Sequence, residues 1–314
     1  MPVAAKKKQE KVAAPIIEAE PSPEALREEQ APAKKVTALV FSYDNAPGLR
    51  RCLAALENSN DRQLIEILVV DCGSHDESPG MDSEFPNITM LRLPRYFGRT
   101  KALNIGTRTA AGEVLLFLTP EVEVMPTTIP ALLARLEGDS EAAAVCPLLM
   151  DTEANPAGQF FRLPTPATGA NVIPVQADKT AEAAPVEYAN FLALMIRKYF
   201  VKGINYLDER YGDFGGDAEL CWQIRRAGKK TLVLPSVTAL YTPVRAEYSA
   251  SAQTTLEADR LHGIATFFGK HYGFMSGLTF RLKAIVKALV MFRLPLLMAL
   301  ASGSKIDGSQ SAIL

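Results

Sequence analysis

Short apolar runs alternate with amphipathic stretches along the chain from Val36 onward. Val36–Phe41 is a continuous apolar run bounded by turn-forming residues, Leu49–Leu56 carries its apolar residues at helical spacing, and Ile65–Val70 is a second β-branched run. A strand, a helix and a strand in this order predict parallel pairing within one buried sheet. The same rhythm predicts further elements, namely strands over Ile88–Leu93, Val114–Leu118 and Ala143–Pro147 and helices over Arg99–Ala110 and Pro126–Leu136.

A second patterned block follows a long interruption. Residues 151–185 are rich in Ala, Pro, Thr and Asn with little periodicity, which predicts a long loop that could lie over a substrate. Beyond it, Tyr188–Arg197 is apolar, Ala218–Ala227 has helical spacing and ends at Gly228, and Thr231–Leu234 has the pattern of a strand. From Glu247 the pattern is helical to about residue 300.

The first segment has no such pattern. Residues 1–35 mix Lys, Glu, Ala and Pro without periodicity and cannot bury enough apolar surface to fold. We therefore expect a disordered tail over 1–35, an α/β domain over 36–246 and a helical extension over 247–314.

Composition narrows the function classes. The chain has 314 residues, of which 48% are hydrophobic and 22% charged, and a net charge of -1, so charge gives no reason to expect a nucleic-acid partner. The four cysteines form no CxxC pair, which argues against a structural zinc site and favours a reducing compartment. No apolar run follows the N-terminal lysines, so we expect a cytoplasmic protein without a secretory signal or anchor.

The first candidate site follows the second predicted strand. Val69–Ser78 places Asp71 at the carboxyl end of this strand, and ligands of open α/β sheets bind at that edge. A carboxylate there can accept hydrogen bonds from a uracil or thymine imide or from a ribose hydroxyl. The alternative is an Asp that only folds its own turn.

The Val69–Ser78 stretch resembles the VDNGSxDxS signature of family 2 glycosyltransferases, with Cys72 where Asn is usual. Three further segments resemble the family in the same order: Asn104–Gly106, Ala111–Leu118, and the acceptor-side half from Arg197 to Gly228. The resemblance implies a GT-A fold with a mostly parallel central sheet flanked by helices, a nucleotide-diphosphate sugar donor, and inversion at the anomeric carbon. Similar bacterial members transfer rhamnose or related sugars in surface polysaccharide assembly.

The resemblance also implies residue roles. Asp71 and Asp44 would hold the nucleoside, with Asn104, Arg99 and Lys101 on the donor side; the alternative for the two cations is a solvated loop. Asp217 would be the general base that takes the proton of the acceptor hydroxyl, and its alternative is a helix N-cap. Glu219 and Trp222 would lie on the acceptor side.

The match departs from the family pattern at three positions. Glu121 stands where the family has the acidic ligand of a divalent cation, Mg²⁺ or Mn²⁺; Tyr241 stands where a His is common, and Gly216 replaces the first acid of a Glu-Asp pair. One interpretation is weakened or absent metal dependence, with Arg95, Arg99 and Lys101 compensating the diphosphate charge. The other is a non-catalytic nucleotide-sugar-binding or scaffold protein with a degenerate metal site.

The C-terminal extension suggests where the acceptor is found. Leu278–Leu300 is apolar but interrupted by basic residues and Pro295, which favours an interfacial helix over a spanning one. Such a helix would dock on the inner face of the cytoplasmic membrane, near lipid-linked acceptors of cell-envelope glycan synthesis. The alternative is that it packs on the catalytic domain or on a second subunit of a homodimer.

Overall fold

The computed structural model describes residues 33–178, 180–244, 249–303 and 305–308. The chain divides into two units, 1–33 and 34–314, and the helices and strands that follow belong to the second. The disordered tail expected over residues 1–35 therefore lies, up to residue 32, outside the described residues.

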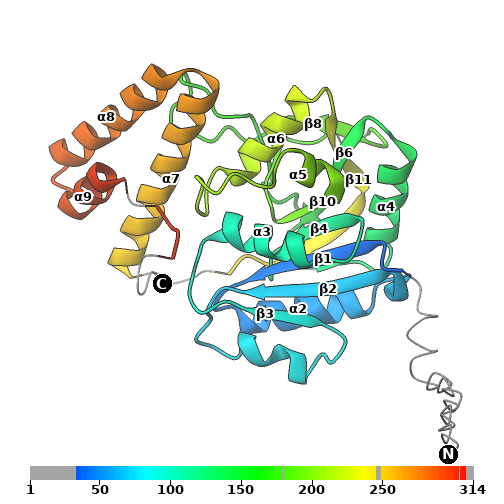
Figure 1. Cartoon of the computed structure of the whole chain (residues 1–314). Coiled ribbons are helices and arrows are strands. Elements are labelled where there is room, and N and C mark those ends of the chain that lie inside the picture. Colours follow the sequence, from blue (N-terminus) through cyan, green and yellow to red (C-terminus); the bar gives the residue numbers. More distant parts are fainter. Residues whose placement is uncertain (1–32, 179, 245–248, 304, 309–314) are drawn as a thin grey trace, which may run out of the picture. The chain divides into compact units, whose positions relative to one another are not determined.

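The central sheet begins with four parallel strands (Figure 1). Their order is β3-β2-β1-β4, and their bounds are β1 (Val36–Ser42), β2 (Ile65–Asp71), β3 (Thr89–Arg92) and β4 (Val114–Leu118). Ser42 pairs with Asp71 and Val40 with Leu118, so the loops after β1, β2 and β4 start at one edge of the sheet. The chain runs outward from β1 to β3 and then returns to β4 on the other side of β1, which creates a switch point between β1 and β4.

The sheet continues beyond β4 with mixed direction. The further strands follow in the order β10 (Ala193–Arg197), β6 (Ala142–Met150), β11 (Lys230–Tyr241) and β5 (Val122–Val124), while β8 (Ala184–Val186) also pairs with β11. β10 runs antiparallel to both of its neighbours, and β11 runs parallel to β6. A separate two-stranded sheet joins β7 (Phe160–Phe161) to β9 (Tyr188–Ala189).

Helices accompany the strands as the alternating pattern predicts. They are α2 (Ala46–Glu57), α3 (Arg99–Thr109), α4 (Thr128–Gly138), α5 (Lys198–Gly203) and α6 (Gly216–Arg226), with short 3₁₀ turns at Arg62–Leu64 and Ser78–Ser83. Every residue of β1 and β4 is buried, because side chains on both faces of these strands meet a core. The fold class predicted from the sequence, an α/β domain with a central sheet flanked by helices, is confirmed, and the sheet is parallel from β3 to β4 and mixed beyond.

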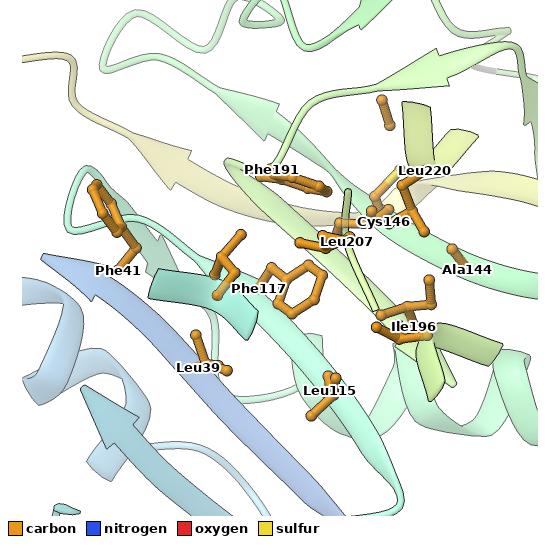
Figure 2. Close-up of a cluster of buried hydrophobic side chains, with 14 of the residues drawn as sticks. Leu39, Phe41, Leu115, Phe117, Ala144, Cys146, Phe191, Ile196, Leu207 and Leu220 are labelled. Carbon is orange, nitrogen blue, oxygen red and sulfur yellow. The ribbon is translucent and has the colours of Figure 1, made fainter. Parts of the chain in front are cut away.

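One of the two cores is drawn in Figure 2. Leu39 of β1, Phe117 of β4 and Ile196 of β10 lie in one buried cluster, which also takes in Leu207 and Leu220 from the acceptor-side half of the chain. The opposite face of β1 packs its Val40 on α2 in a second cluster. The four cysteines are free and buried, as expected of apolar fillers.

Most predicted elements are observed within a few residues, and the exceptions have local reasons. Thr231–Leu234 is only the start of the 12-residue strand β11, whose pairing with β6 is irregular between Leu234 and Thr238. The three-residue strand β5 is too short to leave a periodic signal. Residues 151–185 carry only β7 and the start of β8 among their described residues, so the prediction of a long loop is largely correct.

Three helices form the C-terminal segment. They are α7 (Ala250–His271), α8 (Phe274–Val290) and α9 (Leu294–Ser302), and Ala258, Ala288, Leu296 and Leu300 are buried between them. Gly273, with φ +94, makes the tight turn between α7 and α8. In the part of the chain that the structure describes, no helix is long and apolar enough to cross a membrane.

A buried carboxylate joins α7 to the loop before α6. Asp259 Oδ2 accepts hydrogen bonds from the backbone N–H of Asp213 (2.9 Å) and Phe214 (3.3 Å), and its Oδ1 accepts one from Ile306 N–H (2.9 Å). The carboxylate approaches Gly212 so closely that a Cβ there would lie 2.2 Å from Asp259 Oδ1. Burial raises the pKa of Asp259 to about 7, and the nearby charge of Asp213 adds to this, although the three N–H donors oppose it.

The raised pKa of Asp259 predicts a pH-dependent stability. Because the folded-state pKa exceeds the ordinary value, the folded chain binds more protons than the unfolded chain between about pH 4 and 7. The contribution of Asp259 is therefore fully present below about pH 4 and is lost as the pH rises through 7, by at most about 4 kcal/mol. Urea unfolding of the wild type and of Asp259→Asn should be measured at several pH values. Between about pH 4 and 7 the free energy of unfolding should fall more steeply in the wild type.

The two unfolding series share all other titrating groups, so their difference reports Asp259. Equal slopes of unfolding free energy against pH in both proteins would mean that Asp259 does not titrate in this range.

Candidate donor and catalytic site

The loops after β1 and β4 are joined by a side-chain hydrogen bond. Asn45 caps α2, where its Oδ1 accepts from Gly48 N–H at 3.1 Å. Its Nδ2 donates to Glu121 Oε1, also at 3.1 Å, which connects the loop after β1 to the turn after β4. The switch point of the sheet therefore carries Glu121 beside the start of α2.

Asp71 is buried at the end of β2 and engages its own turn. Its Oδ2 accepts from the backbone N–H of Gly73 and Ser74, both at 3.2 Å, and its Oδ1 accepts from the Ser74 hydroxyl. Burial raises the pKa of Asp71, and these hydrogen bonds oppose the shift. The turn-folding alternative thus accounts for the contacts of Asp71, and a contact with a nucleoside stays a prediction.

Asp44 lies in the neighbouring loop and is tied to the same turn. Its backbone has φ +41, its Oδ1 accepts from His75 N–H at 2.6 Å, and its N–H donates to Ser74 Oγ at 3.0 Å. Asp76, for which the sequence predicts no role, accepts from Ala46 N–H at the start of α2 with its Oδ2 (2.7 Å). The structure brings Asp44 and Asp71 together through Ser74, and the place of Asp76 in the Val69–Ser78 motif was the signal that pointed to it.

Arg99 opens α3 and lies among acidic groups. Its backbone N–H donates to Asp213 Oδ1 at 2.8 Å, and its guanidinium stands 5.4 Å from the centre of the Phe41 ring. Burial by itself lowers the pKa of Arg99, but the charges of Asp213, Asp217 and Glu121 outweigh it and raise the pKa. Its Nε is buried and has no hydrogen-bond partner among the described residues.

The other two residues expected on the donor side make protein contacts. Lys101 places its Nζ 4.5 Å from the centre of the Phe97 ring, a cation–π contact. Asn104 is buried: its Nδ2 donates to Leu207 O and to Glu209 Oε1, both at 2.9 Å, and its Oδ1 accepts from Leu207 N–H. The side chain of Asn104 therefore joins α3 to the segment before α6, and its role toward a donor stays a prediction.

Asp217 lies in the first turn of α6, while the N-cap position is Gly215. The N-cap alternative for Asp217 is therefore not observed. Its Oδ1 accepts from Ala218 N–H at 2.9 Å, and the Tyr188 hydroxyl donates to the carboxylate. Partial burial raises the pKa of Asp217 despite these hydrogen bonds and the nearby Arg99 charge.

The glycine before Asp217 has a packing reason. A Cβ at Gly216 would lie 2.6 Å from Thr100 Oγ1, so the start of α6 and the start of α3 approach too closely for a side chain. Thr100 also donates its hydroxyl to Gly212 O at 2.7 Å, which holds this approach. The departure from the family's Glu-Asp pair is thus part of the contact between α3 and α6.

Glu219 and Trp222 contact α7. Glu219 is buried and accepts from Lys270 Nζ at 2.7 Å and Tyr211 OH at 3.1 Å, and His271 Nε2 lies 2.6 Å from its Oε2. Lys270 and other hydrogen-bond donors lower the pKa of Glu219 although burial opposes them. Trp222 packs on the rings of Phe267, His271 and Tyr272. Neither residue contacts Asp217, so their acceptor-side role stays a prediction. The sequence did not predict that Lys270 and His271 contact Glu219.

The chemistry of the groups around Glu121 does not fit a preformed divalent-cation site. Glu121 supplies one carboxylate, of which Asn45 occupies one oxygen, and the positive charge of Arg99 acts on it. Burial and the charge of Glu121 raise the pKa of Tyr241, which favours a neutral phenol. Within the described part of the chain, no three His, Cys, Asp or Glu side chains come together to hold a metal ion. Such sites draw on several oxygen ligands.

Part of the chain is similar to known proteins. Residues 37–165 match the family described as "Glycosyl transferase family 2". Polypeptide N-acetylgalactosaminyltransferase 12 of Mus musculus is 31% identical over 122 residues, which are 37% of this chain and 21% of that protein. A dolichol-phosphate mannosyltransferase of Pyrococcus furiosus is 24% identical over 113 residues, 35% of this chain and 32% of that protein. The chain thus covers only a fifth to a third of these two relatives.

Solved structures agree over more of the chain. GalNAc-T7, solved with UDP, GalNAc and Mn²⁺, superposes with a TM-score of 0.57 at 16% identity over 74% of this chain and 48% of that one. The mannosyltransferase PcManGT from Pyrobaculum calidifontis, solved with GDP-Man and Mn²⁺, gives a TM-score of 0.54 at 15% identity over 89% of this chain and 79% of that one. Residues 37–165 are thus similar to family 2 glycosyltransferases, and the solved neighbours show that the chain has the GT-A fold.

Proposed function

We propose that the chain is an inverting glycosyltransferase that moves a sugar, rhamnose or another hexose, from a nucleotide-diphosphate donor to a polysaccharide or lipid-linked acceptor of cell-envelope glycan synthesis. The observation that carries the proposal is Asp217 in the first turn of α6, whose raised pKa suits a general base and whose charge, like that of Glu121, acts on Arg99. Relatives named as hexosaminyl- and mannosyltransferases support a transferase, and neighbours solved with UDP or GDP-Man support a nucleotide-sugar donor.

In the proposed reaction Asp217 removes the proton from the acceptor hydroxyl. The hydroxyl oxygen then forms a bond to the anomeric carbon, while the bond from that carbon to the diphosphate oxygen breaks and its electron pair leaves with the diphosphate. Tyr188 holds the Asp217 carboxylate by donating to it, and the start of α6 fixes its direction. Attack from the face opposite the leaving group gives inversion.

The leaving diphosphate requires positive charge, and we assign this role to Arg99. Its guanidinium is partly buried, and its Nε–H is a donor without a partner among the described residues. A buried charge of this kind is more effective than a solvated one because little water screens it. The donor set at Glu121 gives no ground for a step through a metal, so we expect weak dependence on Mg²⁺ or Mn²⁺.

A non-catalytic nucleotide-sugar-binding or scaffold protein is the second candidate. It is favoured by Glu121 and Tyr241, which replace the family's usual metal-site residues. Gly216, the third departure, is explained by its contact with Thr100 and does not by itself favour loss of activity. Calorimetry with nucleotide-sugars, run beside a transfer or hydrolysis assay, distinguishes the two candidates.

We predict that Asp217→Asn abolishes transfer and leaves donor affinity unchanged, because the amide keeps the shape but accepts no proton. The loss in kcat should be about 10² to 10⁴-fold. Glu137→Gln on α4, whose partner is Lys35 at the surface, is a matched control expected to keep full activity. An unchanged kcat in Asp217→Asn would remove the assignment of the base.

Tyr188→Phe gives a more specific measurement. The Tyr188 hydroxyl lowers the pKa of Asp217, so its removal raises that pKa further. A general base works only when ionised, and its activity is therefore lost as the pH falls through its pKa. The acidic limb of the kcat–pH profile should move to higher pH in Tyr188→Phe, with the plateau retained. An unchanged acidic limb would contradict the proposal that Tyr188 acts on the pKa of the base.

Arg99→Gln should lower donor affinity and kcat together by about ten- to a hundredfold, the value of one to two charge-assisted hydrogen bonds. Lys101→Gln, two residues further along α3, is the matched control, with a smaller expected effect because Lys101 stacks on Phe97. Both proteins are assayed with a chelator and with added Mg²⁺ or Mn²⁺. A wild-type rate that disappears in chelator, together with an unaffected Arg99→Gln, would contradict the role of Arg99.

A further inference from the structure

The helices α8 and α9 expose a continuous set of large apolar side chains. Met275, Leu282, Val286 and Leu289 recur at helical spacing along α8, and each is more than half exposed. The turn into α9 adds Phe292, which is 87% exposed, and α9 adds Met298 at 66%. We call this set, together with Val290, Met291 and Leu294, the α8–α9 face. Soluble surfaces seldom carry such a patch unless a partner covers it.

The charge of the same segment has one sign. From Phe274 to Gly303 the sequence contains Arg281, Lys283, Lys287 and Arg293 but no Asp or Glu. Two of these cations are used within the fold. Arg281 donates to Leu300 O at the end of α9, and Arg293 pairs with Glu257 of α7.

Lys283 and Lys287 are different, because they are exposed and form no ion pair with the described residues. Each follows an apolar residue of the α8–α9 face by one position, Leu282 and Val286, so the charges flank the apolar stripe. An apolar stripe beside unpaired cations is the pattern of a helix that lies in the interface of an anionic bilayer.

A groove lies beside the α8–α9 face. It has a volume of about 650 Å³ between α7, α8 and the loop at 166–171, and its lining includes Arg260, Lys283, Lys287 and the apolar Met291. A smaller pocket of about 80 Å³ shares Gly169–Asn171 and Arg260 with it and extends to Tyr188 and Gly215. Tyr188 is the residue that donates to Asp217. The groove and the smaller pocket therefore share part of their lining, and the smaller pocket reaches the residue that contacts the proposed base.

We propose that the α8–α9 face docks on an anionic phospholipid bilayer, and that the groove takes the phosphate end of a lipid from that bilayer. The docking stands without the proposed function; only the further step, that this lipid carries the acceptor, rests on it. A second copy of the chain is the competing occupant of the face. A symmetric dimer would bring Lys283 and Lys287 of both copies to one interface without an acid from either face, so like charges oppose it.

The experiment measures co-sedimentation of the full chain with phosphatidylcholine vesicles and with vesicles that also contain about 30% phosphatidylglycerol. We expect binding to the anionic vesicles that weakens as salt rises, and little binding to the neutral ones. Lys283→Gln with Lys287→Gln should lower the partition coefficient about thirtyfold. Phe292→Asp should lower it as well, without loss of fold, because its side chain is almost fully exposed.

Matched controls come from α5, where Tyr199 is 63% exposed and Lys202 is also exposed. Tyr199→Asp and Lys202→Gln should leave binding unchanged; an equal loss in these variants would show that vesicle binding is not specific to the α8–α9 face. Failure to bind anionic vesicles overturns the proposal. So does a stable dimer in sedimentation equilibrium that Phe292→Asp dissociates.

Asp217→Asn separates this proposal from the proposed function. It should keep full vesicle binding, and it loses transfer only if the catalytic assignment is correct. If the wild type binds anionic vesicles but transfers no sugar, the proposed docking surface is supported and the proposed glycosyltransferase function is contradicted.

Discussion

The buried carboxylate of Asp259 accepts three backbone N–H groups, and this cluster determines how the acceptor-side loop meets the sheet. Two of the donors, Asp213 and Phe214, belong to the loop that leads into α6, and the third, Ile306, follows α9. The side chain of Asp213 in turn accepts from Tyr96 OH and from Arg99 N–H at the start of α3. A helix far along the sequence thus positions both the residue proposed to bind the diphosphate and the helix that carries the proposed base.

The electrostatics of the site depend on this packing. Asp213, Asp217 and Glu121 all act on one guanidinium, and without the burial that brings them together each charge would be screened by water. Asp213 accepts hydrogen bonds from Tyr96 and from the backbone of Arg99, so its carboxylate is used within the fold. The same contacts explain Gly212 and Gly216, where a Cβ would meet Asp259 and Thr100. The departure at Gly216 therefore has a packing cause, because Gly216 and Thr100 form one contact between α3 and α6.

The C-terminal helices have two different roles. Their inner side supplies Asp259, Lys270 and His271, which bind the loop before α6 and Glu219. Their outer side exposes the α8–α9 face, for which the fold provides no cover among the described residues. The first side stabilises the α/β domain, and in our proposal the second side brings that domain to its acceptor.

The sequence by itself determined the alternation of strands and helices, because buried strands and amphipathic helices leave distinct periodicities, and it determined the order of the family motifs. It also located Asp44, Asp71, Arg99, Glu121 and Asp217 in segments that the structure brings to one region. It did not reveal that Asn104 and Glu219 form hydrogen bonds within the fold. Nor did it reveal the hydrogen bonds of Asp76, Asp213 and Asp259. These residues have hydrogen-bond partners up to 117 positions away along the chain, and a periodic pattern records only neighbours along the chain. Only the tertiary structure, by burying charges and bringing distant backbone groups together, decided which carboxylates hold the fold and which face the proposed site.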